Sequence, residues 1–314
     1  MRTDVLQVAT RGSKLALAQT AWVIERLRER FPAKEFETRV IRTSGDDARQ
    51  ERGVPPGKGI FVKEIEDALL RGEAALAVHS LKDMPTELPP GLAIAAVAAR
   101  EDARDALISK TGARLGELPA GAVVGTGSAR RAAQLLAGRP DLRVEPIRGN
   151  LDTRIAKLRG TRESPVAYDA IVVAAAGCRR LGLAGTITQL LPPGLMLPAA
   201  GQGALAVETR HDDDETTAIV AALDDDATRQ ATTAERACLH GLGGGCRVPI
   251  AAYGRMADGA LLLRARVCSP DGREIVESQA SGPPAEAQAL GTALARDLLE
   301  RGAGPLIEEH SQEG

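Results

Sequence analysis

The 314-residue sequence has very few aromatic side chains: one Trp, two Tyr and three Phe, or 2% of the chain. Single-stranded nucleic acids bind largely by stacking on aromatic rings, so this scarcity disfavours that class of partner. The formal net charge of -2 also gives no generally basic surface for nucleic acid or for an anionic membrane. We therefore expect any anion-binding site to be local.

Long apolar runs and closely paired cysteines are also missing. No segment reaches membrane-spanning length, and the N-terminal stretch MRTDVLQVATRGSKLALAQT has no apolar run typical of a signal peptide. The cysteines form no C-x-x-C pair, and a chain of this length needs no disulfides to fold. We expect reduced thiols and a cytoplasmic protein. The cysteines are Cys178, Cys238, Cys246 and Cys268.

One thiol stands in a glycine-rich stretch, GLGGGCRVP, over residues 241–249. Three consecutive glycines leave space for a bulky group beside Cys246, and a neighbouring cation such as Arg247 lowers the pKa of a thiol. This pattern favours a presented nucleophile, but a plain turn between a helix and a strand also fits it. A zinc site with Cys238 and His240 is not indicated, because Cys-x-His-x5-Cys matches no usual ligand spacing.

Short apolar runs alternate with helical periods through the first two thirds of the chain. Residues 5–10 predict a buried strand, and Lys14 to Arg30 has the apolar spacing of a helix. Residues 43–59 are rich in Gly, Pro and charge, which predicts a lid or a binding loop, or else a disordered insertion. We expect the charged segment 100–105 to lead into a second α/β unit.

Arginine recurs after small polar turns that follow predicted strands. This pattern appears four times, with Arg11, with Arg130 and Arg131, with Arg154, and with Arg179 and Arg180. Any one of these arginines is compatible with a solvated surface charge, and Ser13 with a plain helix N-cap. Because arginine forms bidentate bonds to carboxylates, the recurrence predicts a polyanion bound between two α/β lobes.

A carboxylate candidate follows the predicted strand 74–81, which runs into HSLKDMP. Ligand sites of open α/β sheets lie at the carboxyl ends of strands, so Ser80, Lys82 and Asp83 are expected at one rim. Alternatively, Asp83 caps the turn before Pro85. Beyond residue 228, a predicted helix and three alternating strands indicate a small α+β domain that carries Cys246.

Eight segments closely resemble the porphobilinogen deaminase family, the hydroxymethylbilane synthases, and they occur in the same order as in that family. They are ATRGSKLALAQ, GKGIFVKEIEDALL, AVHSLKDMPTELP, VGTGSARRAAQL, IRGNLDTRIAKL, AAGCRRLGL, LPAAGQGALAVETR and GGGCRVPIAAYG. The resemblance implies two periplasmic-binding-protein-like, doubly wound α/β lobes and a third, small α+β domain with the cofactor cysteine. The implied domains are residues 1–99 with 200–221, residues 100–199, and residues 222–314.

The resemblance also implies the reaction. Cys246 is expected to hold a dipyrromethane cofactor through a thioether. Four porphobilinogen molecules are condensed head-to-tail onto it with loss of four ammonia molecules, and 1-hydroxymethylbilane is released by hydrolysis for tetrapyrrole and haem biosynthesis. The resemblance further implies a monomer that passes its product to uroporphyrinogen-III synthase. It implies no bound metal and no binding to nucleic acid or to a membrane.

Site residues are carried over by position in the matching segments. Asp83 is expected to be the catalytic carboxylate that stabilises a cationic azafulvene. Residues expected to bind the cofactor are Cys246, Ser80, Lys82, Asp83, Thr126, Ser128, Arg130, Arg131 and Arg154. Residues expected to bind substrate are Arg11, Ser13, Arg148, Arg154, Arg180, Gln202 and Phe61, the last by stacking. Lys58 is expected in the lid.

The residues by themselves are also compatible with two other functions. A non-catalytic, two-lobed anion-binding protein accounts for the arginines, but it predicts an export signal and gives Cys246 no role. A cysteine-dependent hydrolase needs His240 or His79 within reach of the thiol. Replacement of Asp83 separates these classes, because a binding protein is indifferent to it.

Overall fold

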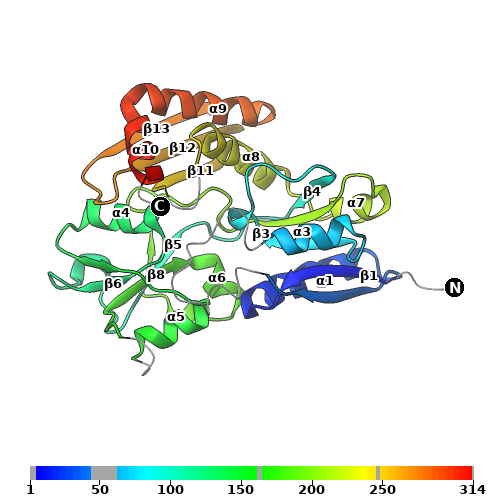
Figure 1. Ribbon diagram of the computed structural model, residues 1–314, viewed down its shortest axis with the longest axis horizontal. Helices are drawn as coiled ribbons and strands as arrows, with labels where there is room; N and C mark the ends of the chain where they lie inside the picture. Colours follow the sequence, from blue (N-terminus) through cyan, green and yellow to red (C-terminus); the bar gives the residue numbers. More distant parts are fainter. Residues whose placement is uncertain (1–4, 44–61, 161–164, 245–247, 313–314) are drawn as a thin grey trace. The chain divides into compact units, whose positions relative to one another are not determined.

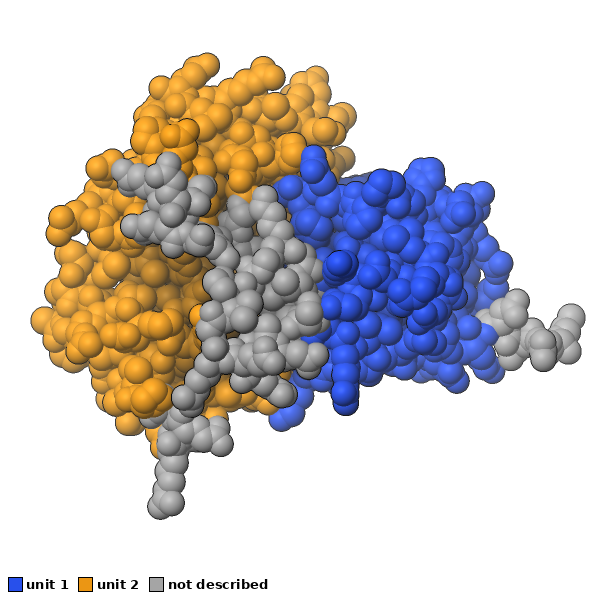
Figure 2. Space-filling model, viewed as in Figure 1, with its two compact units in different colours: residues 1–101, 204–229 blue, residues 102–203, 230–314 orange. Residues whose placement is uncertain are grey.

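The computed structural model describes residues 5–43, 62–160, 165–244 and 248–312 (Figure 1). Lys58, Phe61, Cys246 and Arg247 lie outside the described residues. The chain forms two compact units (Figure 2): unit 1 is residues 1–101 with 204–229, and unit 2 is residues 102–203 with 230–314. The α/β class with two doubly wound sheets and a small third sheet is confirmed. None of the described helices is both long and apolar enough to cross a membrane.

Unit 1 is built on a five-stranded sheet in the order β2-β1-β3-β10-β4. Its strands are β1 (Leu6–Arg11), β2 (Phe36–Ile41), β3 (Leu76–Ser80), β4 (Leu92–Val97) and β10 (Leu205–Arg210). β1 is parallel to β2 and β3, whereas β10 runs antiparallel to both β3 and β4. The carboxyl ends of β1, β2 and β3 therefore lie at one edge of the sheet.

Helices cover both faces of this sheet. Residues of α1 (Lys14–Arg30) and α7 (Asp214–Ala221) pack on one face with Val8, Leu76 and Val207, and residues of α3 (Lys63–Leu70) pack on the other with Ala9 and Ala77. The predicted helix from Lys14 to Arg30 is confirmed by α1. It begins there because the Ser13 hydroxyl accepts a hydrogen bond from the Ala16 amide at 3.2 Å.

Unit 2 contains a second five-stranded sheet in the order β7-β6-β8-β5-β9. Its strands are β5 (Asp105–Ser109), β6 (Val123–Gly125), β7 (Arg143–Glu145), β8 (Ala170–Ala174) and β9 (Gln189–Leu191). β6, β7 and β8 are parallel, and each is followed by a helix, namely α4 (Ala129–Gly138), α5 (Leu151–Leu158) and α6 (Ala175–Arg180). Separate apolar clusters fill the two faces, with Leu135 of α4 in one and Ile155 of α5 in the other.

The third sheet, also in unit 2, is an antiparallel meander of β11 (Ile250–Ala257), β12 (Ala260–Cys268) and β13 (Ile275–Gly282). Residues of α8 (Asp226–Gly241), α9 (Ala287–Leu298) and α10 (Gly304–Gln312) share one apolar core with it. The two-residue turn between β11 and β12 is Asp258-Gly259, and both residues have positive φ, as a tight right-twisted hairpin requires.

Candidate active site

Two predicted segments meet at the carboxyl edge of the unit 1 sheet. Arg11 ends β1, and Ser13 follows it as the N-cap of α1. Ser80 ends β3, and Lys82 and Asp83 follow in a short 3-10 turn, η1 (Leu81–Asp83). Because β1 and β3 are parallel neighbours, the structure brings these residues to the same edge.

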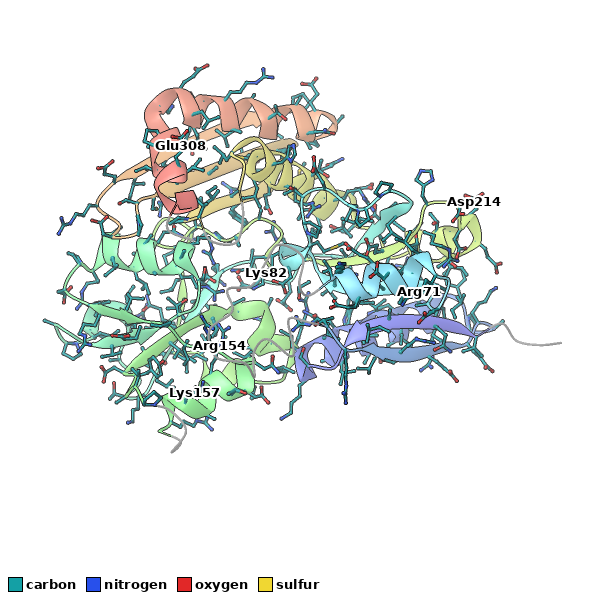
Figure 3. The ribbon with its side chains drawn as sticks, in the orientation of Figure 1. Arg71, Lys82, Arg154, Lys157, Asp214 and Glu308 are labelled. Carbon is teal, nitrogen blue, oxygen red and sulfur yellow. The ribbon has the colours of Figure 1, made fainter. Side chains whose placement is uncertain are left out.

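Buried apolar side chains and a backbone hydrogen bond anchor the β3–η1 turn, whereas its polar side chains are more exposed. Leu81 and Met84 are buried, at 1% and 6% exposure, and the Leu81 amide donates to the Ala204 carbonyl at 3.1 Å. The Ser80 hydroxyl accepts a hydrogen bond from the buried Gln19 amide at 2.9 Å. Lys82, labelled in Figure 3, is half-buried, and Asp83, at the end of the turn, is exposed.

The Asp83 carboxylate is available for chemistry. Within the described part of the chain its side chain has no hydrogen bond, so the alternative in which it caps the turn before Pro85 does not apply. Asp83 is thus an exposed carboxylate on an anchored turn. That is what a group needs in order to stabilise a cation formed from a substrate.

The polar residues of unit 2 also follow the carboxyl ends of parallel strands. Thr126 and Ser128 lie between β6 and α4, and Arg148 lies between β7 and α5. The Thr126 hydroxyl accepts a hydrogen bond from the Ser128 amide at 3.2 Å, which shapes the turn. Arg180 ends α6, the helix that follows β8. Three of the four predicted arginine segments therefore belong to the unit 2 sheet, whereas the fourth, with Arg11, ends β1 of the unit 1 sheet.

Three arginines at this edge have different surroundings. Arg148 is exposed, and its carbonyl accepts a hydrogen bond from Lys157 Nζ at 3.1 Å. Arg154 and Lys157 both belong to α5 (Figure 3), and Arg154 Nε donates to the Gly149 carbonyl at 2.9 Å. Arg180 donates to the Gly203 carbonyl at 2.7 Å. In both of these hydrogen bonds the guanidinium donates to a backbone carbonyl, which carries no formal charge.

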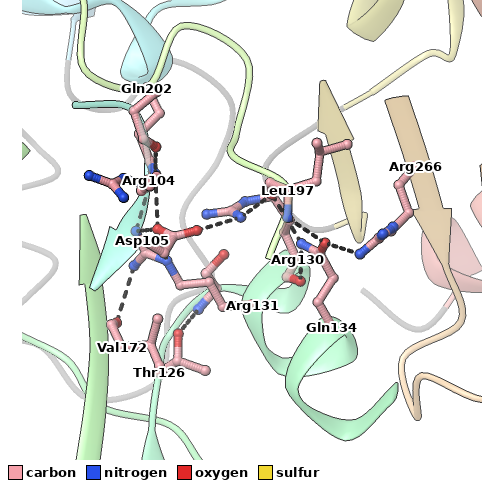
Figure 4. Close-up of polar contacts among 12 residues, drawn as sticks. Arg104, Asp105, Thr126, Arg130, Arg131, Gln134, Val172, Leu197, Gln202 and Arg266 are labelled. Carbon is pink, nitrogen blue, oxygen red and sulfur yellow. Dashed lines mark hydrogen bonds and ion pairs between the residues drawn. The ribbon is translucent and has the colours of Figure 1, made fainter. Parts of the chain in front are cut away.

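Arg130 and Arg131 are placed differently, because both bind a buried carboxylate (Figure 4). Asp105 is fully buried at the start of β5, with its oxygens 2.7 Å from Arg130 and 2.8 Å from Arg131. Gln202 completes the group by donating to Asp105 at 2.9 Å and to the Ala103 carbonyl at 2.7 Å. The structure thus brings three predicted site residues together around an acid.

The electrostatics of this group favour the ionised acid. Burial alone raises the pKa of Asp105, but the charges of Arg130 and Arg131 outweigh burial and lower the pKa to about 2. Asp105 was not singled out from the sequence, where it ends a charged segment expected to be a crossing. The one feature of the sequence that could have indicated its burial is its position directly before the apolar residues 106–108.

The described cysteines do not compete with Cys246 as nucleophiles. Cys178, Cys238 and Cys268 are buried, and burial raises their thiol pKa values to about 11, 12 and 11. His79, one of the two histidines considered for a hydrolase, is also buried, at 5% exposure. No cluster suited to a metal ion occurs among the residues that the structure describes.

Fold and site together define a class: an α/β protein with two doubly wound sheets and a small third sheet, with hydroxyl, cationic and carboxylate side chains at the carboxyl ends of its parallel strands. Comparison with known proteins makes this specific. The model of the porphobilinogen deaminase, dipyromethane cofactor binding domain matches residues 6–218, and that of the porphobilinogen deaminase C-terminal domain matches residues 229–300.

Curated relatives match over nearly their whole length. A porphobilinogen deaminase from Desulforudis audaxviator is 52% identical over 308 residues, covering 98% of this chain and 98% of the relative. One from Thermus thermophilus is 49% identical over 306 residues, covering 97% of this chain and 99% of the relative. This chain belongs to the porphobilinogen deaminase family.

Proposed function

We propose that this chain condenses four porphobilinogen molecules head-to-tail, with loss of four ammonia molecules, and releases 1-hydroxymethylbilane for tetrapyrrole and haem biosynthesis. The observation that carries the proposal is the β3–η1 turn, an anchored turn with the exposed Asp83 carboxylate, in a chain matched by both domain models of the family.

The residues at the two strand edges fit a dipyrromethane group. Such a group carries acetate and propionate side chains, and cations and hydroxyls bind carboxylates. Residues of the described chain that would hold the group are Ser80, Lys82, Thr126, Ser128, Arg130, Arg131 and Arg154. When bound through Cys246, the dipyrromethane supplies the pyrrole carbon to which the first substrate is joined.

Arg130 and Arg131 would have to bind a cofactor carboxylate while they are already bound to another acid. Both side chains are nearly buried, at 5% and 6% exposure, and both bind Asp105. Arg130 also donates to the Leu197 carbonyl at 2.6 Å and Arg131 to the Val172 carbonyl at 3.3 Å. A cofactor carboxylate would therefore share the five N–H groups of each guanidinium with these acceptors. Asp105 would then fix the direction in which each guanidinium points.

Asp83 is proposed to act on the substrate. Loss of ammonia breaks the aminomethyl carbon–nitrogen bond and leaves a positive charge delocalised over the pyrrole. A fixed carboxylate near the pyrrole nitrogen stabilises that charge, and it accepts a proton as aromaticity returns after the new carbon–carbon bond forms. Arg11, Ser13, Arg148, Arg180 and Gln202 are proposed to bind substrate, Phe61 to stack on it, and Lys58 to belong to a lid.

The same proposal covers the wider setting of the enzyme. We expect a cytoplasmic monomer that passes its product to uroporphyrinogen-III synthase. We also keep the division into three domains, residues 1–99 with 200–221, 100–199 and 222–314. The three sheets support it, since the first and second belong to different units and the third has its own core.

The test is an assay of the purified protein with porphobilinogen alone. The proposal predicts that ammonia appears in step with porphobilinogen consumed. Asp83→Asn should lower kcat about 100-fold or more with little change in KM, because an amide cannot stabilise the cation. Glu87→Gln, which neutralises an exposed acid just beyond the same turn, is the matched control and should retain wild-type kcat.

Two outcomes would contradict the proposal separately. If the wild type leaves porphobilinogen unchanged, the proposed reaction is wrong. If the wild type is active and Asp83→Asn matches it, the reaction stands but Asp83 is not its catalytic carboxylate.

A further inference from the structure

Three ionisable side chains are buried together on the α3 side of the unit 1 sheet. Glu66 of α3, His79 of β3 and Glu208 of β10 are 6%, 5% and 0% exposed. His79 Nε2 lies 3.1 Å from Glu208 Oε2. No step proposed so far uses these residues, and burial of charged groups is costly unless they are paired.

The polar atoms of this cluster are incompletely satisfied. His79 Nε2, Glu66 Oε1 and both carboxylate oxygens of Glu208 are buried without a hydrogen bond among the described residues. Burial first, and then the charge of Glu208, raise the pKa of Glu66 to about 7; His79 opposes this shift and Asp67 adds to it. The raised pKa favours the neutral acid at Glu66, beside the buried pair of His79 and Glu208.

Other charged groups nearby are already engaged. On α3, Asp67 acts on Glu66 in the same direction as Glu208. On β10, two residues beyond Glu208, Arg210 binds Asp213 at 2.8 Å and the Leu69 carbonyl at 3.0 Å. The facing residues of β4 are apolar, since Glu208 pairs with Ile94. Among the residues that the structure describes, Glu66 and Glu208 are thus the acids found beside His79.

The cluster is coupled to the catalytic turn through two strands. β3 continues from His79 through Ser80 directly into η1 and Asp83. Ala206 of β10 pairs with His79, and Leu205 pairs with Ser80. The segment leading into β10 also holds the turn itself, through the Leu81 amide and the Ala204 carbonyl. Displacement of either strand would move Asp83.

We propose that His79 is a positioning residue for the reaction: its ring pairs with Glu208 and thereby fixes β3 and β10, so that the Ser80–Asp83 turn keeps its reactive geometry. This inference rests on the proposed function. It gives the two buried acids different roles, which makes the same substitution at each of them informative.

The first test compares Glu208→Gln with Glu66→Gln in the full-length, cofactor-loaded protein. Glu208→Gln removes the carboxylate that pairs with His79 and should lower kcat about 10-fold while KM for porphobilinogen changes less than about 3-fold. Glu66→Gln replaces a neutral acid by a neutral amide of the same shape, so its kcat at about pH 6 should fall far less. His79→Gln combined with Glu208→Gln should lower kcat no further than either alone, because both break one pair.

The second test measures stability and needs no turnover. The raised pKa of Glu66 contributes stability that is present below its ordinary pKa of 4.5 and is lost as pH rises through about 7. Glu66→Gln lacks this loss. The melting temperature of Glu66→Gln relative to wild type should therefore rise between about pH 5 and pH 8, and so should the ratio of its kcat to the wild-type kcat.

The proposed function is tested by the wild type alone, and it stands if the wild type converts porphobilinogen. The inference about His79 is tested by the variants. Equal effects of the two Glu→Gln changes on kcat would overturn the assignment. So would a pH-independent difference in melting temperature. Glu208→Gln could also yield less folded protein while kcat per folded molecule stays unchanged. The cluster would then have only a structural role, and the inference would be contradicted.

Discussion

Among single residues, Asp105 determines what Arg130 and Arg131 are able to do. From the sequence, these two arginines were expected to face bound carboxylates directly. In the structure, a fully buried aspartate already lies between them, and Gln202 donates to the same acid. Asp105 lies 25 residues from Arg130 along the chain. Local periodicity carries no signal for a pair at that separation, so only the fold reveals it.

Replacement of Asp105 should destabilise the protein strongly. Asp105→Asn keeps the shape but leaves two nearly buried guanidiniums without their carboxylate, which typically costs about 3–5 kcal/mol in unfolding free energy. Urea denaturation at neutral pH measures this cost. The pKa of about 2 lies below the ordinary 3.8, so the contribution of Asp105 is present above about pH 4 and is lost as pH falls towards 2.

The control is a surface pair of the same chemistry. Asp141 binds Arg139 at 2.7 Å but is 39% exposed, so Asp141→Asn should leave the unfolding midpoint almost unchanged. Equal midpoints for Asp105→Asn and the wild type would contradict the account of the buried pair.

At the scale of helices and strands, α8 is connected to two other segments by one side chain. Glu235 is fully buried, and its two oxygens accept hydrogen bonds from the Gly201 and Gly254 amides, each at 2.7 Å. Glu235→Gln replaces one acceptor by an amide donor that faces a backbone N–H. We expect a loss of about 1–3 kcal/mol in unfolding free energy, measured by urea denaturation.

Glu274→Gln, at an exposed position just before β13, is the matched control and should unfold like the wild type. If both variants unfold at the same urea concentration, Glu235 does not hold α8 as the geometry indicates.

The three described cysteines should be unreactive in the folded protein. Cys178, Cys238 and Cys268 belong to α6, α8 and β12, and burial raises their thiol pKa values. A thiol reagent followed by peptide mapping should leave all three unmodified at neutral pH and modify them after denaturation. Modification of any of them in the native protein, at the rate seen in denaturant, would contradict this.

Elements with strong local patterns were predicted well. α1 has the bounds expected from apolar spacing and its Ser13 cap, and β1 and β3 follow from short apolar runs. β9 was missed because three residues are too few to show a period. The antiparallel position of β10 between β3 and β4 depends on pairing across the chain, which local pattern does not encode.

For the molecule as a whole, net charge and composition set limits but did not locate the site. A formal charge of -2 is compatible with an anion-binding enzyme because a few arginines, among them Arg11 and Arg148, lie where parallel strands end, whatever the charge of the rest of the chain. The chain passes between units after residues 101, 203 and 229, so each unit contains segments distant in sequence. The motifs identified the family, whereas the partners of Arg130, Arg131 and His79 required the three-dimensional structure.

The most direct test of the central claim is the intact mass of the purified protein beside a Cys246→Ser sample. A chain that works through a thioether-linked dipyrromethane should exceed its sequence mass by two linked pyrrole units, and the variant should not. If the wild type shows only the bare-chain mass, incubation with porphobilinogen should add the two units. A wild type that stays at the bare-chain mass after incubation, or a Cys246→Ser sample that carries the same excess, would contradict the account.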